Sequence, residues 1–293
     1  MSSPAASPSP LKLLLRTAAA LNSTHNDLNG CQKGMSLLGY TCKMLAMFLE
    51  FYVPSSFTVK SLSSGLSKLY LQTLTSRYCI RLVNGPSSVF DAIRYDSWAY
   101  PPLPELPLAE TEYPYTRESH PSVRAVEKTM PYTMLGYYPT EYVAYASWFF
   151  PGLLHNGDAP PAGSLRDSGK WKSADFFSAV SCSFWLMYIV ADIVVQSERV
   201  HRITAILGKL RAGETPAEGG LVADLEAQLY NSKVLLGREV LSLLPAFAWS
   251  FEDVAANPKV PNAAINSLMW LESILDYVTK VDSRMPGGSF LRP

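Results

Sequence analysis

The pattern of apolar and polar positions along the chain predicts a succession of α-helices. Long segments carry apolar side chains three or four residues apart, which is the spacing of one face of a helix. Prolines and glycines interrupt the pattern between these segments. The predicted helices cover residues 11–21, 28–52, 57–84, 87–100, 140–154, 176–195, 221–251 and 263–281. We therefore expect an all-α fold of helical hairpins joined by proline-rich linkers.

Proline-rich and glycine-rich stretches divide the chain into regions. Between Tyr100 and Pro131 seven prolines occur, more than a packed helix or a central strand tolerates, because proline lacks a backbone N–H donor. The predicted regions are a disordered N-terminus (1–10), an amphipathic helical region (11–99), a proline-rich linker (100–131), an aromatic helix (132–154), a second linker (155–170), a C-terminal helical membrane region (171–282) and a tail (283–293).

The segment 59–83 has a charge pattern that points to a membrane surface. Its apolar face is formed by Leu62, Leu66, Leu69, Thr73, Ser76, Ile80 and Val83, and its basic residues are Lys60, Lys68, Arg77 and Arg81. No Asp or Glu occurs between Phe51 and Phe90. A helix with an apolar face and only positive charge suits an anionic phospholipid membrane as its partner. The alternative is a surface helix of a soluble bundle.

Residues 176–191 form the best candidate for a helix that enters a membrane. These sixteen residues are uncharged; as a helix they extend about 24 Å, against a hydrocarbon core of about 30 Å. Extending the helix to Val195 supplies the missing length but includes Asp192. The segment therefore crosses the membrane, inserts halfway or is buried in protein. The aromatic helix 140–154 suits either the headgroup layer or an aromatic core, so one or two membrane-associated hydrophobic helices are expected.

Composition supports membrane association. Of the 293 residues, 48% are hydrophobic and 17% are charged, whereas about 25% are charged in typical soluble domains. The formal net charge is zero, so nothing in the overall balance indicates nucleic acid as a partner.

The chain lacks the residue patterns of common catalytic and metal sites. Its four histidines are isolated from one another, and its four cysteines include no Cys-x-x-Cys pair. No Gly-x-Ser-x-Gly, phosphate-binding glycine loop or His-Glu-x-x-His occurs. We therefore expect no enzymatic activity, no cofactor and no metal.

Four short patterns follow one another along the chain. The first two are Gly30, Lys33, Tyr40 and Lys43 in the second predicted helix, and Arg77, Arg81 and Leu82 in the third. The other two are the aromatic run Tyr137–Tyr142 and the C-terminal set Ser273, Ile274, Leu275 and Tyr277. The order and spacing of these patterns resemble those of the peroxin eleven family, which comprises peroxisomal membrane proteins that elongate the organelle and help it to divide.

The resemblance departs from the family pattern at several positions. An Asp and an Arg of the second helix are replaced by Gln32 and Ser36, and a Lys of the third by Tyr78. Near the C-terminus Trp270 replaces a Gly, and Asp276 interrupts an apolar run. The last helix is therefore not expected to follow the family in crossing the membrane.

The resemblance implies a function in the peroxisomal membrane. A cytosol-facing amphipathic helix would insert into the outer leaflet, and homo-oligomers would elongate the membrane and cooperate with the organelle-fission machinery. In this chain, the membrane-binding residues would be Lys60, Lys68, Arg77, Arg81, Leu62, Leu66, Leu69 and Ile80.

Two other functions fit the residues. One is a membrane pore or transport protein of the peroxisome or mitochondrion, with Asp192 as a polar site within the membrane; the serine-rich, basic N-terminus partly resembles a mitochondrial transit peptide. The other is a peripheral helical scaffold.

Overall fold

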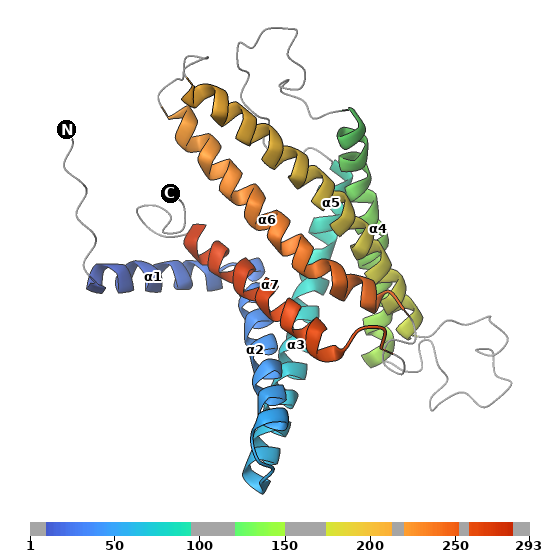
Figure 1. The fold of residues 1–293 in the computed structure, drawn as a ribbon. Helices are drawn as coiled ribbons and strands as arrows, with labels where there is room; N and C mark the ends of the chain where they lie inside the picture. Colours follow the sequence, from blue (N-terminus) through green and yellow to red (C-terminus); the bar gives the residue numbers. More distant parts are fainter. Residues whose placement is uncertain (1–9, 95–120, 150–173, 213–219, 252–257, 284–293) are drawn as a thin grey trace, which may run out of the picture. The chain divides into compact units, whose positions relative to one another are not determined.

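A computed structural model describes residues 10–94, 121–149, 174–212, 220–251 and 258–283 (Figure 1). Within these ranges the chain forms seven helices and no strand, which confirms the predicted all-α fold. The helices are α1 (Pro10–His25), α2 (Leu28–Tyr52), α3 (Phe57–Arg94), α4 (Pro121–Phe149), α5 (Ala174–Arg211), α6 (Leu221–Trp249) and α7 (Asn262–Ser283). The predicted regions 1–9, 100–120, 155–170 and 284–293 lie outside the described residues.

Two predicted boundaries are wrong. Helix α3 continues through Gly85 and Pro86, and α4 begins at Pro121, inside the predicted proline-rich linker. The first turn of a helix needs no N–H from its residues, so proline is favoured there. Further along α4, Pro131 is accommodated in a stretch where Met130 packs against α5. Tertiary contacts of this kind outweigh the local cost of proline.

The chain divides into two compact units, which we describe separately. The first contains the residues up to Ile80 and those from Trp270 onward, and the second contains Arg81 to Met269. Helices α3 and α7 each contribute to both units.

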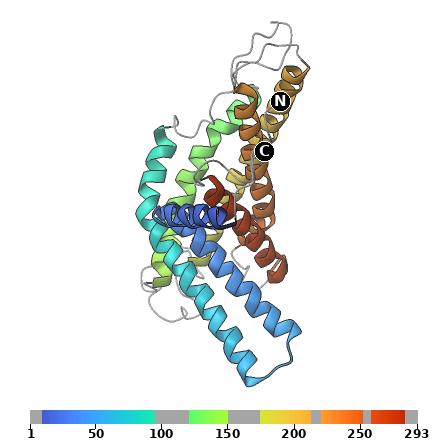
Figure 2. The ribbon, with the colours of Figure 1, turned by 90° about the vertical axis from the view of Figure 1, so that its left-hand side faces the viewer.

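In the first unit, α2 and α3 form an antiparallel hairpin (Figure 2). The turn between them ends at Ser56, whose Oγ accepts a hydrogen bond from the Val59 N–H at 3.2 Å. A serine in this position satisfies one of the free N–H groups at a helix N-terminus. The hairpin is therefore closed by a serine cap at the start of α3.

The end of α7 packs along α2 through polar contacts. Lys33 pairs with Asp276 at 2.5 Å, and the hydroxyls of Ser36 and Ser273 lie 3.0 Å apart. Trp270 donates a hydrogen bond from its indole nitrogen to the Thr41 hydroxyl at 3.1 Å. Because the residue numbers rise along α2 as they fall along α7, the two helices are antiparallel.

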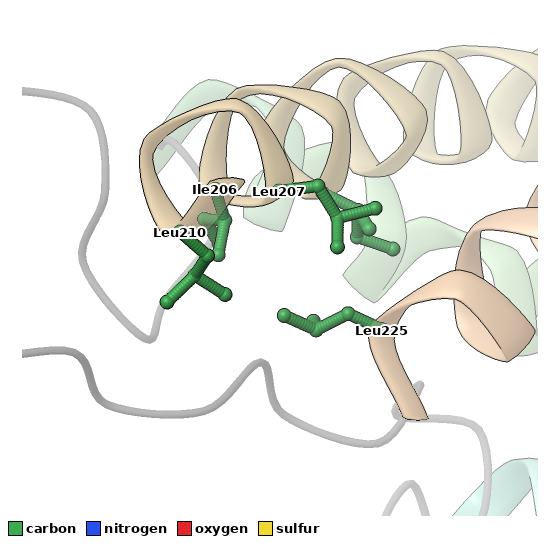
Figure 3. Close-up of a cluster of buried hydrophobic side chains, with 5 residues drawn as sticks. Ile206, Leu207, Leu210 and Leu225 are labelled. Carbon is green, nitrogen blue, oxygen red and sulfur yellow. The ribbon is translucent and has the colours of Figure 1, made fainter. Parts of the chain in front are cut away.

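In the second unit, α5 packs between α4 and α6 (Figure 1). At the join of α5 and α6 a cluster of buried aliphatic side chains consists of Ile203, Ile206, Leu207, Leu210 and Leu225 (Figure 3). At the other end of this pair the rings of Trp185 and Trp249 stack with centroids 6.2 Å apart. These two contacts show that α5 and α6 are antiparallel over nearly their whole length.

Replacement of Leu225 by alanine tests this packing. Leu225 is fully buried, so Leu225→Ala should lower the free energy of unfolding by about 3 kcal/mol through lost apolar contact and the cavity that remains. The measurement is denaturant unfolding of the detergent-solubilised protein. Leu244→Ala is the matched control on the same helix, because Leu244 is exposed. Equal losses for the two variants would contradict the packing of α6 described above.

Candidate membrane-binding surface

Helix α3 packs against α2 through small and polar side chains. Ser63 and Thr73 are buried, and Ser63 donates to the Glu50 carboxylate at 2.5 Å. A Cβ built on Gly39 would lie only 2.5 Å from the Thr73 hydroxyl oxygen. The two helices thus approach so closely that a larger side chain at Gly39 would clash with Thr73.

Tyr70 is the largest side chain of α3 at this contact. Its ring lies 5.8 Å from that of Tyr40, and the Lys43 ammonium lies 5.7 Å from its centroid. Burial raises the pKa of the Tyr70 hydroxyl, the neighbouring Tyr40 and Tyr78 raise it further, and Arg77 opposes them. Tyr70 therefore stays neutral at physiological pH.

Three leucines of α3 are exposed: Leu62 and Leu69 beside this contact, and Leu71 on the side away from it. Leu62, Leu69 and Leu71 are 53%, 40% and 58% exposed, and Leu66 and Ile80 are half-buried. A helix of a soluble bundle turns its leucines toward the core. Small and polar residues at the helix contact with leucines outside are typical of helices that pack in lipid. The arrangement therefore fits α3 to an apolar environment on its outer side.

The predicted basic residues fall into two groups. Lys60 and Lys68 are exposed. Arg77 is half-buried, and among the described residues its Nε has no hydrogen-bond partner. The charges of Lys60 and Lys68 are thus the ones that α3 presents to an anionic surface.

Arg81 has a different role from the one the sequence predicts. Its Nη1 lies 2.6 Å from Glu141 Oε1 and donates to the Tyr137 hydroxyl at 2.8 Å. Tyr137 donates to the same Glu141 oxygen, and Tyr142 donates to the backbone carbonyl of Arg81 at 2.9 Å. Arg81 therefore holds α3 to α4 within the second unit, and the expectation that its charge faces lipid is corrected.

Glu141 was missed by the sequence reasoning, although a signal was present. It is the only charged residue between Lys128 and Phe149. A single acid in a long uncharged aromatic stretch needs a cationic partner when it is buried. The sequence pattern does not identify that partner, because Arg81 lies 60 residues away in the sequence.

Helix α5 is the one described helix that is long and apolar enough to cross a membrane, by length and composition. Its buried Asp192 accepts a hydrogen bond from Gln196 at 3.1 Å. Tyr188 lies within the electrostatic influence of Asp192 and also of Arg238 and Glu239 on α6. Asp192 thus belongs to a polar layer between α5 and α6, and a transport role for it stays a prediction.

Charged contacts lie between this polar layer and the start of α6. Arg211 pairs with Glu226 at 2.6 Å, and Arg199 donates to Gln228 at 2.7 Å. Exposed hydrophobic residues occur on both helices, at the level of the layer and toward the Trp185–Trp249 end: Met187, Val190, Val194, Val240, Leu244 and Phe247. Together they form an apolar band across the α5–α6 pair.

The apolar segments of α5 and α6 differ in length. Residues 240–249 of α6 are uncharged and extend about 15 Å as a helix, which is close to the depth of one leaflet. The Lys259 ammonium lies 5.8 Å from the centroid of the Phe251 ring, just beyond the end of α6. Of the two helices, α5 therefore has the longer apolar segment, and α6 packs along it.

Comparison of the chain with family models, curated proteins and solved structures finds no match in any of the three.

The ion pair between Arg81 and Glu141 is testable by paired substitutions. Glu141→Leu alone leaves the Arg81 guanidinium buried without its counter-ion and should cost about 3 kcal/mol of stability. The double variant Arg81→Met with Glu141→Leu should recover most of that loss, because both charges are gone. The measurement is denaturant unfolding in detergent. A single-variant loss below about 1 kcal/mol, the value of an exposed pair, would contradict a structural role for this contact.

Proposed function

We propose that this chain is a peroxisomal membrane protein that elongates the membrane by inserting the apolar face of α3 into the cytosolic leaflet. One observation carries the proposal: Leu62 and Leu69 are exposed on the part of α3 from Phe57 to Arg81, where the exposed charges are the basic Lys60 and Lys68. The helix places apolar area in the acyl layer and positive charge at the level of the phosphates. Shallow insertion expands one leaflet relative to the other, and this favours curvature.

The expected strength of one helix is modest. Two half-exposed leucines contribute about 1 kcal/mol each on transfer to the acyl layer, and two lysines contribute about 1 kcal/mol each at an anionic surface. A total of about 4 kcal/mol corresponds to millimolar affinity. One copy of α3 therefore binds weakly, and stable remodelling requires both an anchor and several copies acting together.

In this proposal, helix α5 is the membrane anchor. Its length and composition suit a membrane helix, and α4 and α6 pack along it within the second unit. In the proposal, α5 keeps the protein on the membrane, and homo-oligomers bring many copies of α3 to the same leaflet. The placement in peroxisomes, and the cooperation with fission machinery, rest on the resemblance to the peroxin eleven family.

Substitution of one leucine on each side of α3 tests insertion directly. Leu69→Ser should reduce the tubulation of anionic vesicles several-fold, and Leu62→Ser with Leu69→Ser should abolish it, because the apolar face is lost. Leu71→Ser is the matched control: Leu71 is exposed but lies nearly opposite Leu69 around the helix. Tubulation is scored by electron microscopy of the reconstituted full chain. If Leu71→Ser is as damaging as Leu69→Ser, the inserting face has been misidentified.

Neutralising the exposed lysines tests the electrostatic part. Lys60→Gln with Lys68→Gln should weaken binding to anionic vesicles roughly 30-fold at low salt, from about 1 kcal/mol per charge, and high salt should narrow the difference. Flotation of the protein with vesicles measures this. Lys128→Gln with Lys233→Gln removes two exposed charges elsewhere and should have little effect. Arg81 is unsuitable for this test, since its replacement breaks the contact with Glu141.

The cellular location can be read from one image. A fluorescent protein fused to the N-terminus should coincide with a peroxisomal marker, and overexpression should elongate the labelled organelles. Coincidence with a mitochondrial marker instead would contradict the proposed location and favour the interpretation of the serine-rich, basic N-terminus as a transit peptide.

A further inference from the structure

Helix α2, like α3, exposes large apolar side chains and buries small ones. Its buried residues at the contact include the small Gly39 and Ala46 beside Tyr40. Its large apolar side chains are exposed instead: Leu38, Leu45, Phe48 and Tyr52. Positions 38, 45 and 52 are seven residues apart and so share one side of the helix. The outer side of α2 is therefore an apolar surface that is left exposed by the described residues of the first unit.

This surface lies on the same side of the hairpin as the leucines of α3. The end of α7 contacts α2 through Lys33 and Ser36, and by the 100° helical step Leu38 and Leu45 point the opposite way. On α2 the side that contacts α3 is marked by Gly39 and Glu50, and on α3 the contacting side is marked by Thr73 and Ser63. When the 100° step is counted from these residues along two antiparallel right-handed helices, Leu62 and Leu69 lie on the same side of the hairpin as Leu38 and Leu45. We call these four leucines the hairpin face.

The end of the hairpin is aromatic. Phe51, Tyr52 and Phe57 are 73%, 77% and 89% exposed, and the ring of Tyr52 stacks on that of Phe48 with centroids 5.4 Å apart. No charged residue occurs from Phe51 to Val59. Aromatic side chains concentrate at the boundary between lipid headgroups and acyl chains. The tip thus has the composition of a segment that enters this layer.

We propose that the inserting element is the whole α2–α3 hairpin, and that the hairpin face and the aromatic tip enter the anionic leaflet together. This inference rests on the proposed function of α3 and extends it to α2. Charge favours lipid as the occupant over a second copy of the chain, because Lys60 and Lys68 of α3 are exposed cations and no Asp or Glu occurs between Phe51 and Phe90. Lys68 lies about 100° and Lys60 about 180° around the helix from Leu69, so these cations lie on the polar side of α3 and not on the hairpin face. The same segment of a second copy offers them no acidic partner, whereas anionic headgroups neutralise them.

A two-helix wedge acts more strongly than one helix. Each helix with its side chains is about 10 Å wide, so insertion of the pair displaces roughly twice the lipid area in a single leaflet. The Gly39–Thr73 contact keeps the helices close, and the displaced area is therefore fixed by the fold.

The test compares two leucine pairs in the full-length protein. Leu38→Ser with Leu45→Ser, and separately Leu62→Ser with Leu69→Ser, should each weaken flotation with vesicles of phosphatidylserine and phosphatidylcholine about 30-fold, from about 1 kcal/mol per leucine. Leu71→Ser with Leu271→Ser removes two exposed leucines elsewhere and should bind as the unmodified chain does. Circular dichroism checks that all three variants keep their helix content. Normal binding by the α2 pair with loss by the α3 pair overturns the inference and leaves the proposed function standing. Normal binding by both pairs overturns both.

A photo-crosslinker identifies the occupant. Benzoylphenylalanine introduced at position 52 of the full chain should crosslink to labelled phospholipid when anionic vesicles are present. Crosslinking to a second copy of the chain, with or without vesicles, and no lipid adduct would overturn the proposal and make the hairpin face a contact between copies.

Discussion

The close approach of α2 and α3 is the constraint on which the rest of this account depends. Gly39 packs against Thr73, and Ser63 donates to the Glu50 carboxylate, so the two helices approach closely at these positions. Leu38, Leu45, Leu62 and Leu69 lie outside the contact and are exposed, where water penalises them by about 25 cal/mol for each Å² of apolar surface. A membrane leaflet removes that penalty, and this is why the hairpin is better matched to lipid than to water.

The packing of α3 distinguishes a basic residue that forms a buried ion pair from two that stay exposed. Arg81 is committed to Glu141 and holds α3 to α4, whereas Lys60 and Lys68 stay exposed where α3 packs on α2. The buried ion pair and the exposed cations thus occupy different parts of one helix. In the proposed function, α5, with its polar layer around Asp192 and Gln196, is the membrane anchor and the α2–α3 hairpin is a weakly binding wedge. Such a combination would let curvature depend on the number of copies present.

Much of the fold could be predicted from helical periodicity, and the failures have physical causes. The helices around Leu38, Leu62 and Leu268 follow from apolar spacing alone. The ends of α3 and α4 do not: α3 continues through Gly85 and Pro86, and α4 begins at Pro121, because proline is favoured in the first turn of a helix. Apolar spacing predicts the stripe of α3. It does not predict the side that packs on α2, because Ser63 and Tyr70 are polar residue types and a packing side is expected to be apolar. The aromatic tip of the hairpin (Phe51, Tyr52 and Phe57) is not predicted, because helical periodicity identifies the faces of a helix and gives no information about its ends.

Spin labels placed one at a time at positions 61–72 of the membrane-bound protein test the central claim most directly. Collision rates with oxygen and with a water-soluble nickel complex report whether each position of α3 lies in acyl chains or in water. The account predicts oxygen-rich values at 62 and 69, water-rich values at 64 and 71, and a period of 3.6 residues between them. Uniform exposure to water on anionic vesicles, or maxima at 64 and 71, would contradict the insertion of this face.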